Sequence, residues 1–483
     1  MNEESVMELL RKYNGPLRRE KMTMAKFLEG HYKEYIKSLQ TLVYDEKSSI
    51  LGESLYEIIN EKISNIDSTC KDVVKILELC DQGKMEVAHE KFNKLMERLE
   101  DIIIKTIFVS SLNGLYRIRS GSKNDNFGRM DLFHISFNQR ENINAYRFSI
   151  AGYPSLYLGE TIDVCWFECG MPKSFYVSQY ELNIINKRER IIGLDNCPDN
   201  YLILVDLSTK PFDLISNAII KTEDTKKMIL EYICLYPLII ACSCVTKNKD
   251  VAFIEEYTIS QLLCLWVKNH AKIDGIRYQT ISRFDDDQDI NNKNIVLPAK
   301  KIDEFGFCGR LKDYFKISKP VYRSLRESFN EKVCQEKAEQ IQKLFNDLNS
   351  GDYKKIRRRD SLFENIFMLC KNFIDVYNCI VSEQYLSPEV LYSNMNTLNL
   401  YARSLNQEFQ KRKDNGDLFN QVYSIDTGFK KEELKKNINK IFIDFETVVS
   451  DIKVFENYST YINNKNDIGE SCSFEYIQYD NDH

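Results

Sequence analysis

Helix-breaking residues are concentrated in the middle of this 483-residue chain. Six of the nine prolines lie between residues 112 and 310, together with ten of the eighteen glycines and both tryptophans. The flanks hold few such residues and are rich in Lys, Glu, Asn, Leu and Ile. Because Gly and Pro end helices and shape turns, this distribution predicts a helical segment, then mixed α and β structure, then a second helical segment.

Apolar residues in both flanks recur at helical spacing. Residues 1–108 offer several helices, which predicts a helical N-terminal domain. In residues 311–483, one apolar helix face is formed by residues at steps of three and four, namely Phe363, Ile366, Phe367, Cys370 and Ile374. This second flank is therefore predicted to be a helical C-terminal bundle. Its basic run at residues 354–360 is interpreted as a solvated face.

The middle part, residues 109–310, alternates strand-like and helix-like segments. Seven short segments are enriched in Tyr, Phe, Ile and Val, namely LYRIR, FHISF, SLYLG, FYVSQYEL, YLILVDLS, GIRYQTI and NIVLP. Helices are predicted over residues 162–169, about 222–241 and 258–270. The sequence thus predicts an α+β domain of about 200 residues, which is long enough to bury its own core.

Charge balance and cysteine spacing argue against several classes of protein. Lys and Arg total 66 against 72 Asp and Glu, whereas nucleic-acid binders usually carry a basic surplus. The fourteen cysteines include no C-x-x-C pair, which favours reduced thiols in a cytosolic protein. The first residues lack an apolar signal segment, and the longest apolar run, residues 232–245, is shorter than the roughly 20 residues of a membrane span. We expect a cytoplasmic protein without a membrane or nucleic-acid partner.

The common catalytic and metal-binding motifs are missing. There is no G-x-x-x-x-G-K-[ST], G-x-G-x-x-G, G-x-S-x-G or H-E-x-x-H. The five histidines are scattered without ligand spacing, so no metal is predicted. His134, in FHISF, is interpreted as a structural histidine on a strand.

Polar side chains gather instead on strand and helix candidates of the middle part. Arginine suits a diphosphate because its planar guanidinium binds two oxygens at once, and an aromatic face suits a nicotinamide or adenine ring. A carboxylate beside a ribose stabilises the positive charge that develops at C1′ when the base leaves. Buried Arg–Glu pairs and core tyrosines also serve structure, so that alternative stays open. The candidates are Arg117, Arg140, Arg147, Tyr157, Glu168, Thr280 and Ser282.

These segments resemble the RES domain, a family named for an Arg, a Glu and a Ser. RFSIAGYPSLYLGETIDVCWFE, which follows LYRIR, is similar to the family's Arg, its Gly-x-x-x-Leu-Tyr-Leu strand and its helix with the Glu. DGIRYQTI and NIVLPAK are similar to the strand with the Ser and the N-x-x-L-P piece after it. The resemblance covers about residues 114–300. It implies a fold similar to that of ADP-ribosyltransferases.

The resemblance also implies roles for individual residues. Arg117 and Arg147 would hold phosphate or ribose oxygens of NAD, and Tyr157 would contact its nicotinamide nucleoside. Glu168 would stabilise the oxocarbenium-like state. These four residues would make residues 109–310 an NAD-binding catalytic domain.

The family's Ser is the position at which this chain departs from the pattern. The best-matching hydroxyl belongs to Thr280, which keeps the O–H and adds a stiff methyl group. Ser282, two residues on, would share its strand face, and Arg140 is a further candidate for NAD binding. The substitution leaves open whether water or phosphate attacks the sugar.

RES proteins are typically toxins of toxin–antitoxin pairs that consume NAD. The resemblance therefore implies an NAD glycohydrolase or phosphorylase that acts as a growth-arresting toxin or antiviral defence effector, with NAD, and for a phosphorylase inorganic phosphate, as substrates. Two alternatives stay open, an ADP-ribosyltransferase that modifies a macromolecule and a helical interaction scaffold without activity. An antitoxin, a regulatory protein or further copies of the chain are the expected protein partners. The helical flanks are expected to regulate the domain or assemble it.

Overall fold

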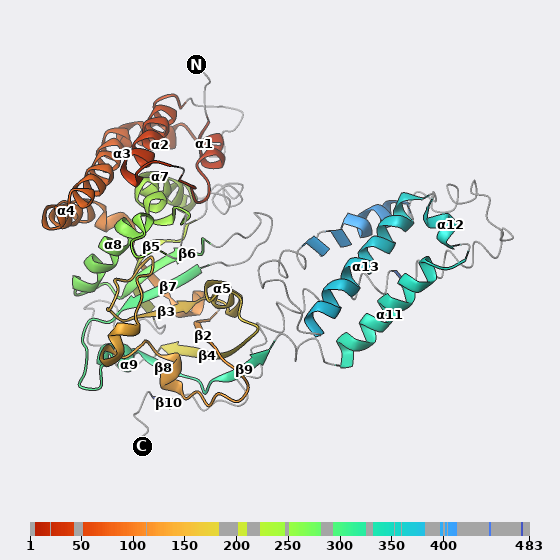
Figure 1. The fold of residues 1–483 in the computed structure, drawn as a ribbon. Helices are drawn as coiled ribbons and strands as arrows, with labels where there is room; N and C mark the ends of the chain where they lie inside the picture. Colours follow the sequence, from red (N-terminus) through yellow and green to blue (C-terminus); the bar gives the residue numbers. More distant parts are fainter. Residues whose placement is uncertain are drawn as a thin grey trace.

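The computed structural model describes most of the chain up to residue 381 and short pieces beyond it (Figure 1). The described residues are 5–19, 21–42, 52–112, 114–182, 201–209, 223–246, 251–281, 293–324, 332–351, 353–358, 360–381, 397–398, 401–402, 404–412, 444–445 and 475–476. Of the predicted site residues, only Ser282 lies outside them.

The N-terminal part is helical, as its apolar spacing predicts. It contains α1 (Val6–Lys12), α2 (Met24–Gln40), α3 (Gly52–Asp81) and α4 (Met85–Ile103). Helix α1 begins with a capping box, in which the Ser5 hydroxyl accepts from the Glu8 N–H and the Glu8 carboxylate accepts from the Ser5 N–H. Between α3 and α4 the chain reverses at Gly83, whose φ of +71° favours glycine.

A mixed sheet forms the centre of the molecule. Its strands are β1 (Ile104–Phe108), β2 (Tyr116–Ser120), β3 (Ser155–Gly159), β4 (Ser174–Leu182), β5 (Tyr201–Leu207), β6 (Gly275–Gln279), β7 (Lys293–Pro298), β8 (Phe315–Ile317), β9 (Val321–Ser324) and β10 (Glu475–Tyr476). In the described residues the order is β1-β5-β6-β7-β3-β2-β4-β8-β10, and β9 also pairs with β4. Among the described strands, only β5 and β6 pair in parallel. This mixed sheet with separate helices agrees with the predicted α+β class.

One predicted strand is wrong. The segment FHISF lies between two short 3₁₀ helices, Arg129–Leu132 and Phe137–Asn142. It contacts the loop of residues 303–308 and does not pair with a strand. The Cys308 N–H donates to His134 Nε2 at 2.9 Å, and the Phe137 N–H donates to the Gly306 oxygen at 2.6 Å. Partners this far away in the chain cannot be predicted from the local pattern of apolar residues.

The sheet takes strands from all three predicted parts of the chain. β1 precedes the expected boundary at residue 108 and pairs with β5, while β8 and β9 follow the boundary at residue 310, which falls inside α9 (Gly309–Tyr314). A strand needs a neighbour for its backbone hydrogen bonds, and that neighbour can come from any distance along the chain. The structure therefore differs from the predicted boundaries in extending the middle part at both ends.

Helices cover one face of the sheet and join it to the N-terminal part. α7 (Glu223–Ser243) and α8 (Thr258–Asn269) lie between the N-terminal helices and strands β5, β6 and β7 (Figure 1). A single apolar cluster includes residues of α1 to α4, α7 and α8 and of this sheet face, such as Val205, Ile276 and Val296. On the opposite face, Leu156, Leu158 and other apolar residues form a second cluster. The N-terminal helices thus share their core with the middle part.

A proline inside α7 explains one contact between these parts. Pro237 has no N–H, so the carbonyl of Ile233 loses the hydrogen bond that it would accept one turn later. The hydroxyl of Tyr35, on α2, donates to this carbonyl oxygen at 2.8 Å. The hydroxyl of Tyr32 donates to the Pro237 carbonyl at 2.6 Å. The proline therefore remains inside the helix because a buried tyrosine replaces the missing donor.

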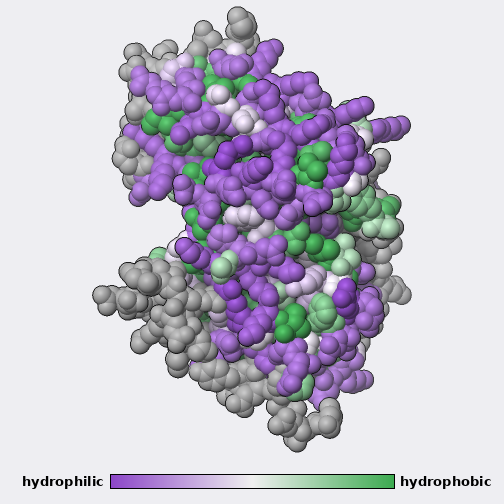
Figure 2. Space-filling model, turned by 90° about the vertical axis from the view of Figure 1, so that its left-hand side faces the viewer, coloured by the Kyte–Doolittle hydropathy of each residue, from purple (hydrophilic) through white to green (hydrophobic). Residues whose placement is uncertain are grey.

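The C-terminal helices lie to one side of the sheet (Figure 1). They are α11 (Lys332–Leu348), α12 (Tyr353–Arg357) and α13 (Ser361–Val381). α13 carries the predicted apolar face, with Phe363, Ile366 and Cys370 buried, and Phe345 of α11 stacks on Phe367 with ring centroids 4.7 Å apart. Among the described residues, no helix combines the length and the apolar character that crossing a bilayer requires. Figure 2 shows a side of the molecule on which hydrophilic residues predominate and hydrophobic patches are small.

Candidate functional site

The helix α5 (Ile162–Glu168) carries Glu168 at its last position. The helix begins at Thr161, whose hydroxyl accepts from the Val164 N–H at 3.3 Å, and the chain turns after it at Gly170. It packs closely on the end of β3, because Gly159 has no side chain and Cys165 lies directly above it. The Cys165 thiol donates to the Tyr116 carbonyl of β2 at 3.1 Å. The position of Glu168 is thus fixed against two strands.

Glu168 accepts two hydrogen bonds on one carboxylate oxygen. The hydroxyl of Thr280, which follows β6, donates to Glu168 Oε1, and the Asn294 amide of β7 donates to the same oxygen at 3.0 Å. Oε2 accepts no hydrogen bond from the residues that the structure describes. Glu168 is exposed, whereas Asn294 is 4% exposed. The result is an oriented carboxylate with one free oxygen at the surface.

Two buried tyrosines lie beside this carboxylate. Burial raises the pKa of Tyr278 on β6 well above its usual value, and the charge of Glu168 adds most to that effect, followed by Tyr157. Burial also raises the pKa of Tyr157 on β3, with a smaller contribution from Glu168. Both tyrosines therefore stay neutral. The Tyr157 hydroxyl oxygen is buried, and the Ser149 side chain lies close enough to oppose the rise in its pKa.

Arg117 lies on β2, next to the place where the sheet is least continuous. β2 and β3 pair through one residue pair only, Tyr116 with Gly159. Burial raises the pKa of Cys165, and the charges of Arg117 and Glu168 act on that thiol in opposite directions. Arg117 Nη1 is buried and has no hydrogen-bond partner among the residues that the structure describes. A buried N–H without an acceptor costs folding free energy. This N–H is therefore suited to donate to an anionic or carbonyl oxygen of a ligand.

Arg147 is held at the end of α7. Its Nη1 donates to the Cys242 carbonyl at 3.0 Å and its Nη2 donates to the Cys244 carbonyl at 2.8 Å. The guanidinium also lies over the Tyr257 ring, 4.8 Å from its centroid. A cation at the last carbonyls of a helix is a stabilising cap. The structure therefore gives Arg147 a structural set of partners.

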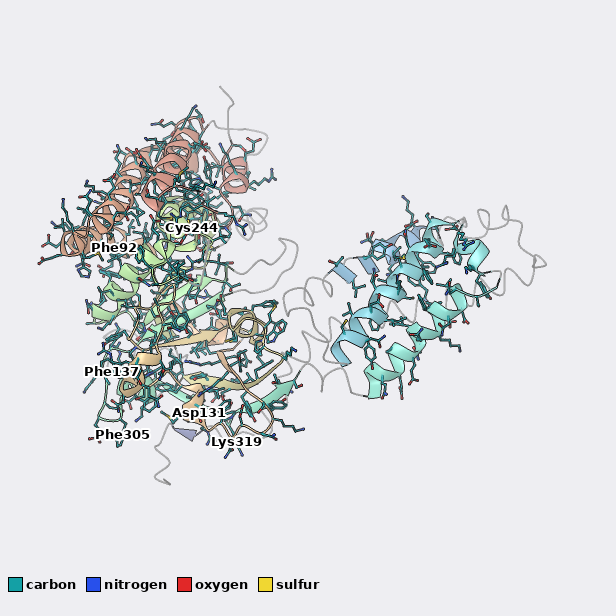
Figure 3. All side chains as sticks on the ribbon, viewed as in Figure 1. Phe92, Asp131, Phe137, Cys244, Phe305 and Lys319 are labelled. Carbon is teal, nitrogen blue, oxygen red and sulfur yellow. The ribbon has the colours of Figure 1, made fainter. Side chains whose placement is uncertain are left out.

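Arg140 lies apart from both Glu168 and Arg147. Its guanidinium stacks on Phe137 at 4.9 Å, and it lines a cavity at the end of β3 opposite to Gly159. Figure 3 labels Phe137 and Cys244, the latter beside the Arg147 guanidinium, and they lie well apart in the view. The structure thus brings Glu168, Thr280 and Tyr157 together and does not place Arg140 with them.

His134 is buried and uses both ring nitrogens. Nε2 accepts from the Cys308 N–H at 2.9 Å, and Nδ1 contacts the Ile135 carbonyl oxygen at 2.9 Å, which fits a neutral ring with its proton on Nδ1. The pKa of His134 is lowered to about 4, mainly by burial and in smaller part by the charge of Arg117. The structural interpretation of His134 agrees with these contacts, although the residue lies in a loop and not on a strand.

Acid is therefore expected to weaken the fold through His134. The unfolded chain binds this proton near pKa 6.5 and the native state near 4, so the stability that neutral His134 contributes is complete above about pH 6.5 and is lost as the pH falls toward 4. Between pH 7.5 and 4.5 the free energy of unfolding should fall by about 2–3 kcal/mol more in the natural protein than in His134→Gln. Urea unfolding at both pH values measures this difference, and equal losses in the two proteins would contradict it.

Some residues of the site were not predicted from the sequence. Asn294 was not a site candidate, although it is the Asn of the N-x-x-L-P piece in NIVLPAK, and that piece is the signal that could have found it. Glu160, which is fully buried after β3, receives two hydrogen bonds from Arg277 of β6, at 2.5 and 2.9 Å, and Arg277 also reaches Asp206 of β5 at 3.5 Å. This ion pair fixes the residue that precedes the cap of α5.

Gly159 offers a test of how α5 is positioned. A Cβ at this residue would lie 2.6 Å from Cys165 Sγ and 3.0 Å from the Thr161 carbonyl oxygen, so Gly159→Ala should push α5 away and lower the free energy of unfolding by about 1–3 kcal/mol. Gly30→Ala in α2, where a Cβ meets nothing within 4 Å, should instead raise it by about 0.5–1 kcal/mol. Urea unfolding of both variants checks the opposite signs. A stabilised Gly159→Ala protein would show that the helix does not pack this closely.

Comparison with known proteins gives one relative and a limited match. The chain is 32% identical over 315 residues to a Bacillus subtilis protein named "Putative toxin YopC". The match covers 61% of this chain and 65% of that protein. No family model matches the sequence, so the resemblance to the RES domain stays a prediction. No solved structure matches the chain.

Proposed function

We propose that this protein is a toxin that degrades NAD at the site of Glu168, Thr280 and Tyr157, to which Arg117 would contribute. The observation that carries the proposal is the Glu168 carboxylate, which two donors orient through Oε1 while Oε2 accepts no hydrogen bond from the described residues. The relative named as a toxin supports the biological role. The resemblance to the RES domain supports NAD as the substrate and an ADP-ribosyltransferase-like fold.

The reaction proposed for this site breaks the bond between C1′ of the ribose and N1 of nicotinamide. The bonding electron pair leaves with nicotinamide, which becomes neutral, and a positive charge develops on the sugar. The free oxygen of Glu168 stabilises this charge, while Thr280 and Asn294 keep the carboxylate in place. Water or phosphate then bonds to C1′, and the proton of an attacking water passes to the solvent. Arg117 Nη1 would donate to a ribose or phosphate oxygen.

Incubation of the full chain with NAD, with and without inorganic phosphate, tests this function by mass spectrometry of the products. Free nicotinamide with ADP-ribose indicates hydrolysis, and nicotinamide with phosphorylated ADP-ribose indicates phosphorolysis. Transfer of labelled ADP-ribose to a macromolecule would instead indicate a transferase. NAD that stays intact after long incubation with the folded protein would contradict the proposal.

A further inference from the structure

A cavity of about 250 Å³ lies at the end of β3 that is farthest from Glu168. Ser155, the first residue of β3, and Pro298, the last residue of β7, form its floor. Cys264, Leu265 and Lys268 of α8 line one side, and the loop with Arg140 and residues 150–153 lines the other. The cavity is therefore built from a strand end, a helix and a loop.

The charged groups of this cavity are both cations. Arg140 stacks on Phe137, and the Lys268 Nζ lies over the Tyr153 ring, 3.6 Å from its centroid. Each contact holds a long side chain against an aromatic face and leaves its N–H donors available. No Asp or Glu lines the cavity, and neither cation forms an ion pair with a carboxylate among the described residues. The described residues thus leave the positive charge at this place without a neutralising carboxylate.

The remaining lining fits a small ligand. Ile150, Ala151, Leu265 and Pro298 supply apolar walls, and the Ser155 hydroxyl and the Tyr153 ring border the same space. Binding pockets commonly combine apolar walls with a few polar groups. Because pockets for drug-sized molecules measure roughly 300–1,000 Å³, this cavity suits a smaller group.

The loop that closes the cavity is fixed to α8. The Gln261 amide of α8 donates to the Tyr146 and Ser149 carbonyls at 3.3 and 3.4 Å. Gly152 has a φ of +74°, and the Arg140 Nε would lie 3.6 Å from a Cβ there. The glycine conformation thus lets the loop turn beneath the guanidinium.

We infer that this cavity is a binding site for a small anion of the phosphate class, held by Arg140 and Lys268 and separate from the Glu168 site. Two cations on facing elements neutralise a dianion better than one, and arginine binds two of its oxygens at once. The loop of residues 143–153 leads to β3, which carries Tyr157, so occupancy would stabilise the strand that lines the proposed catalytic site.

Calorimetric titration of the full chain at low salt tests the inference, with inorganic phosphate and inorganic pyrophosphate as probes and AMP as a probe whose phosphate carries a nucleoside. One of the three should bind, and Arg140→Met and Lys268→Met should each raise its Kd by at least about tenfold. Lys268→Arg should retain most of the affinity. Lys272→Met, which removes an exposed cation just beyond α8, is the matched control and should bind as the natural protein does. Circular dichroism confirms that each variant is folded.

Glu168→Gln separates this inference from the proposed function. That variant should bind the probe with unchanged Kd, because the cavity lies at the opposite end of β3. Three results would overturn the inference: no heat with any probe, equal weakening in Lys272→Met and Lys268→Met, or loss of binding in Glu168→Gln. The last result would place the anion at the Glu168 site. Anion binding without NAD cleavage would support the inferred anion site and contradict only the proposed function.

Discussion

Glu168→Gln is expected to reduce the release of nicotinamide from NAD by about 100-fold or more. A preorganised group that stabilises developing charge typically contributes 10²–10³ in rate, and Gln replaces a full negative charge with a neutral amide. The amide oxygen can still accept from Thr280 and Asn294, so the local structure should persist. Because Glu168 is exposed at the end of α5, its replacement should barely change the free energy of unfolding. The initial rate of nicotinamide formation measures the effect.

Two further variants make this result specific. Glu181→Gln removes an exposed carboxylate from β4 and should leave the rate unchanged. Thr280→Ser should keep most of the rate because the hydroxyl is retained, whereas Thr280→Val should lower kcat because only its hydroxyl is lost. A Glu168→Gln protein that releases nicotinamide at the natural rate would show that this carboxylate is not catalytic.

Arg277→Met is expected to lower the free energy of unfolding by about 3–5 kcal/mol. Arg277 donates to both carboxylate oxygens of Glu160, and the Glu160 side chain is 0% exposed. Removal of the guanidinium would take the positive charge of Arg277 away from a buried carboxylate. Urea unfolding measures the loss, and the double variant Glu160→Gln with Arg277→Met should lose less than Arg277→Met alone because it contains no buried charge there.

An exposed ion pair supplies the matched control for this experiment. Lys33 and Glu29 on α2 lie 2.6 Å apart with their side chains 73% and 48% exposed. Lys33→Met should change the free energy of unfolding by at most about 0.5 kcal/mol, since water screens such pairs. Similar losses in Arg277→Met and Lys33→Met would mean that the buried pair does not hold β3 and β6 together.

Local sequence patterns predicted most of the elements that build the candidate site. The helix of residues 162–168 and the strands that carry Tyr157 and Tyr278 follow from apolar spacing over five to seven residues. FHISF was misjudged because the His134 ring and the Phe137 N–H bond to a loop about 170 residues away in the chain. The central sheet also takes β1 and β8 from outside residues 109–310, since strand partners are chosen at long range.

The arginines show most clearly what local patterns could not predict. Arg140 and Arg147 lie seven residues apart, and both suit an anion by residue type. The fold turns Arg147 toward the last carbonyls of α7 and Arg140 toward a cavity beside α8. Asn294 was not recognised as a site residue, because its donation to Glu168 arises only when β7 lies between β6 and β3.

The sequence by itself determined the helices, most of the strands and the types of residue that could act on NAD, because apolar periodicity and side-chain chemistry are local properties. Only the tertiary structure decided which of these residues meet. Glu168 and Thr280 are 112 positions apart, and they touch because the strand order β6-β7-β3 brings the end of β6 beneath α5. Strand order depends on the burial of whole sheet faces and the pairing of distant backbones, which no short segment specifies.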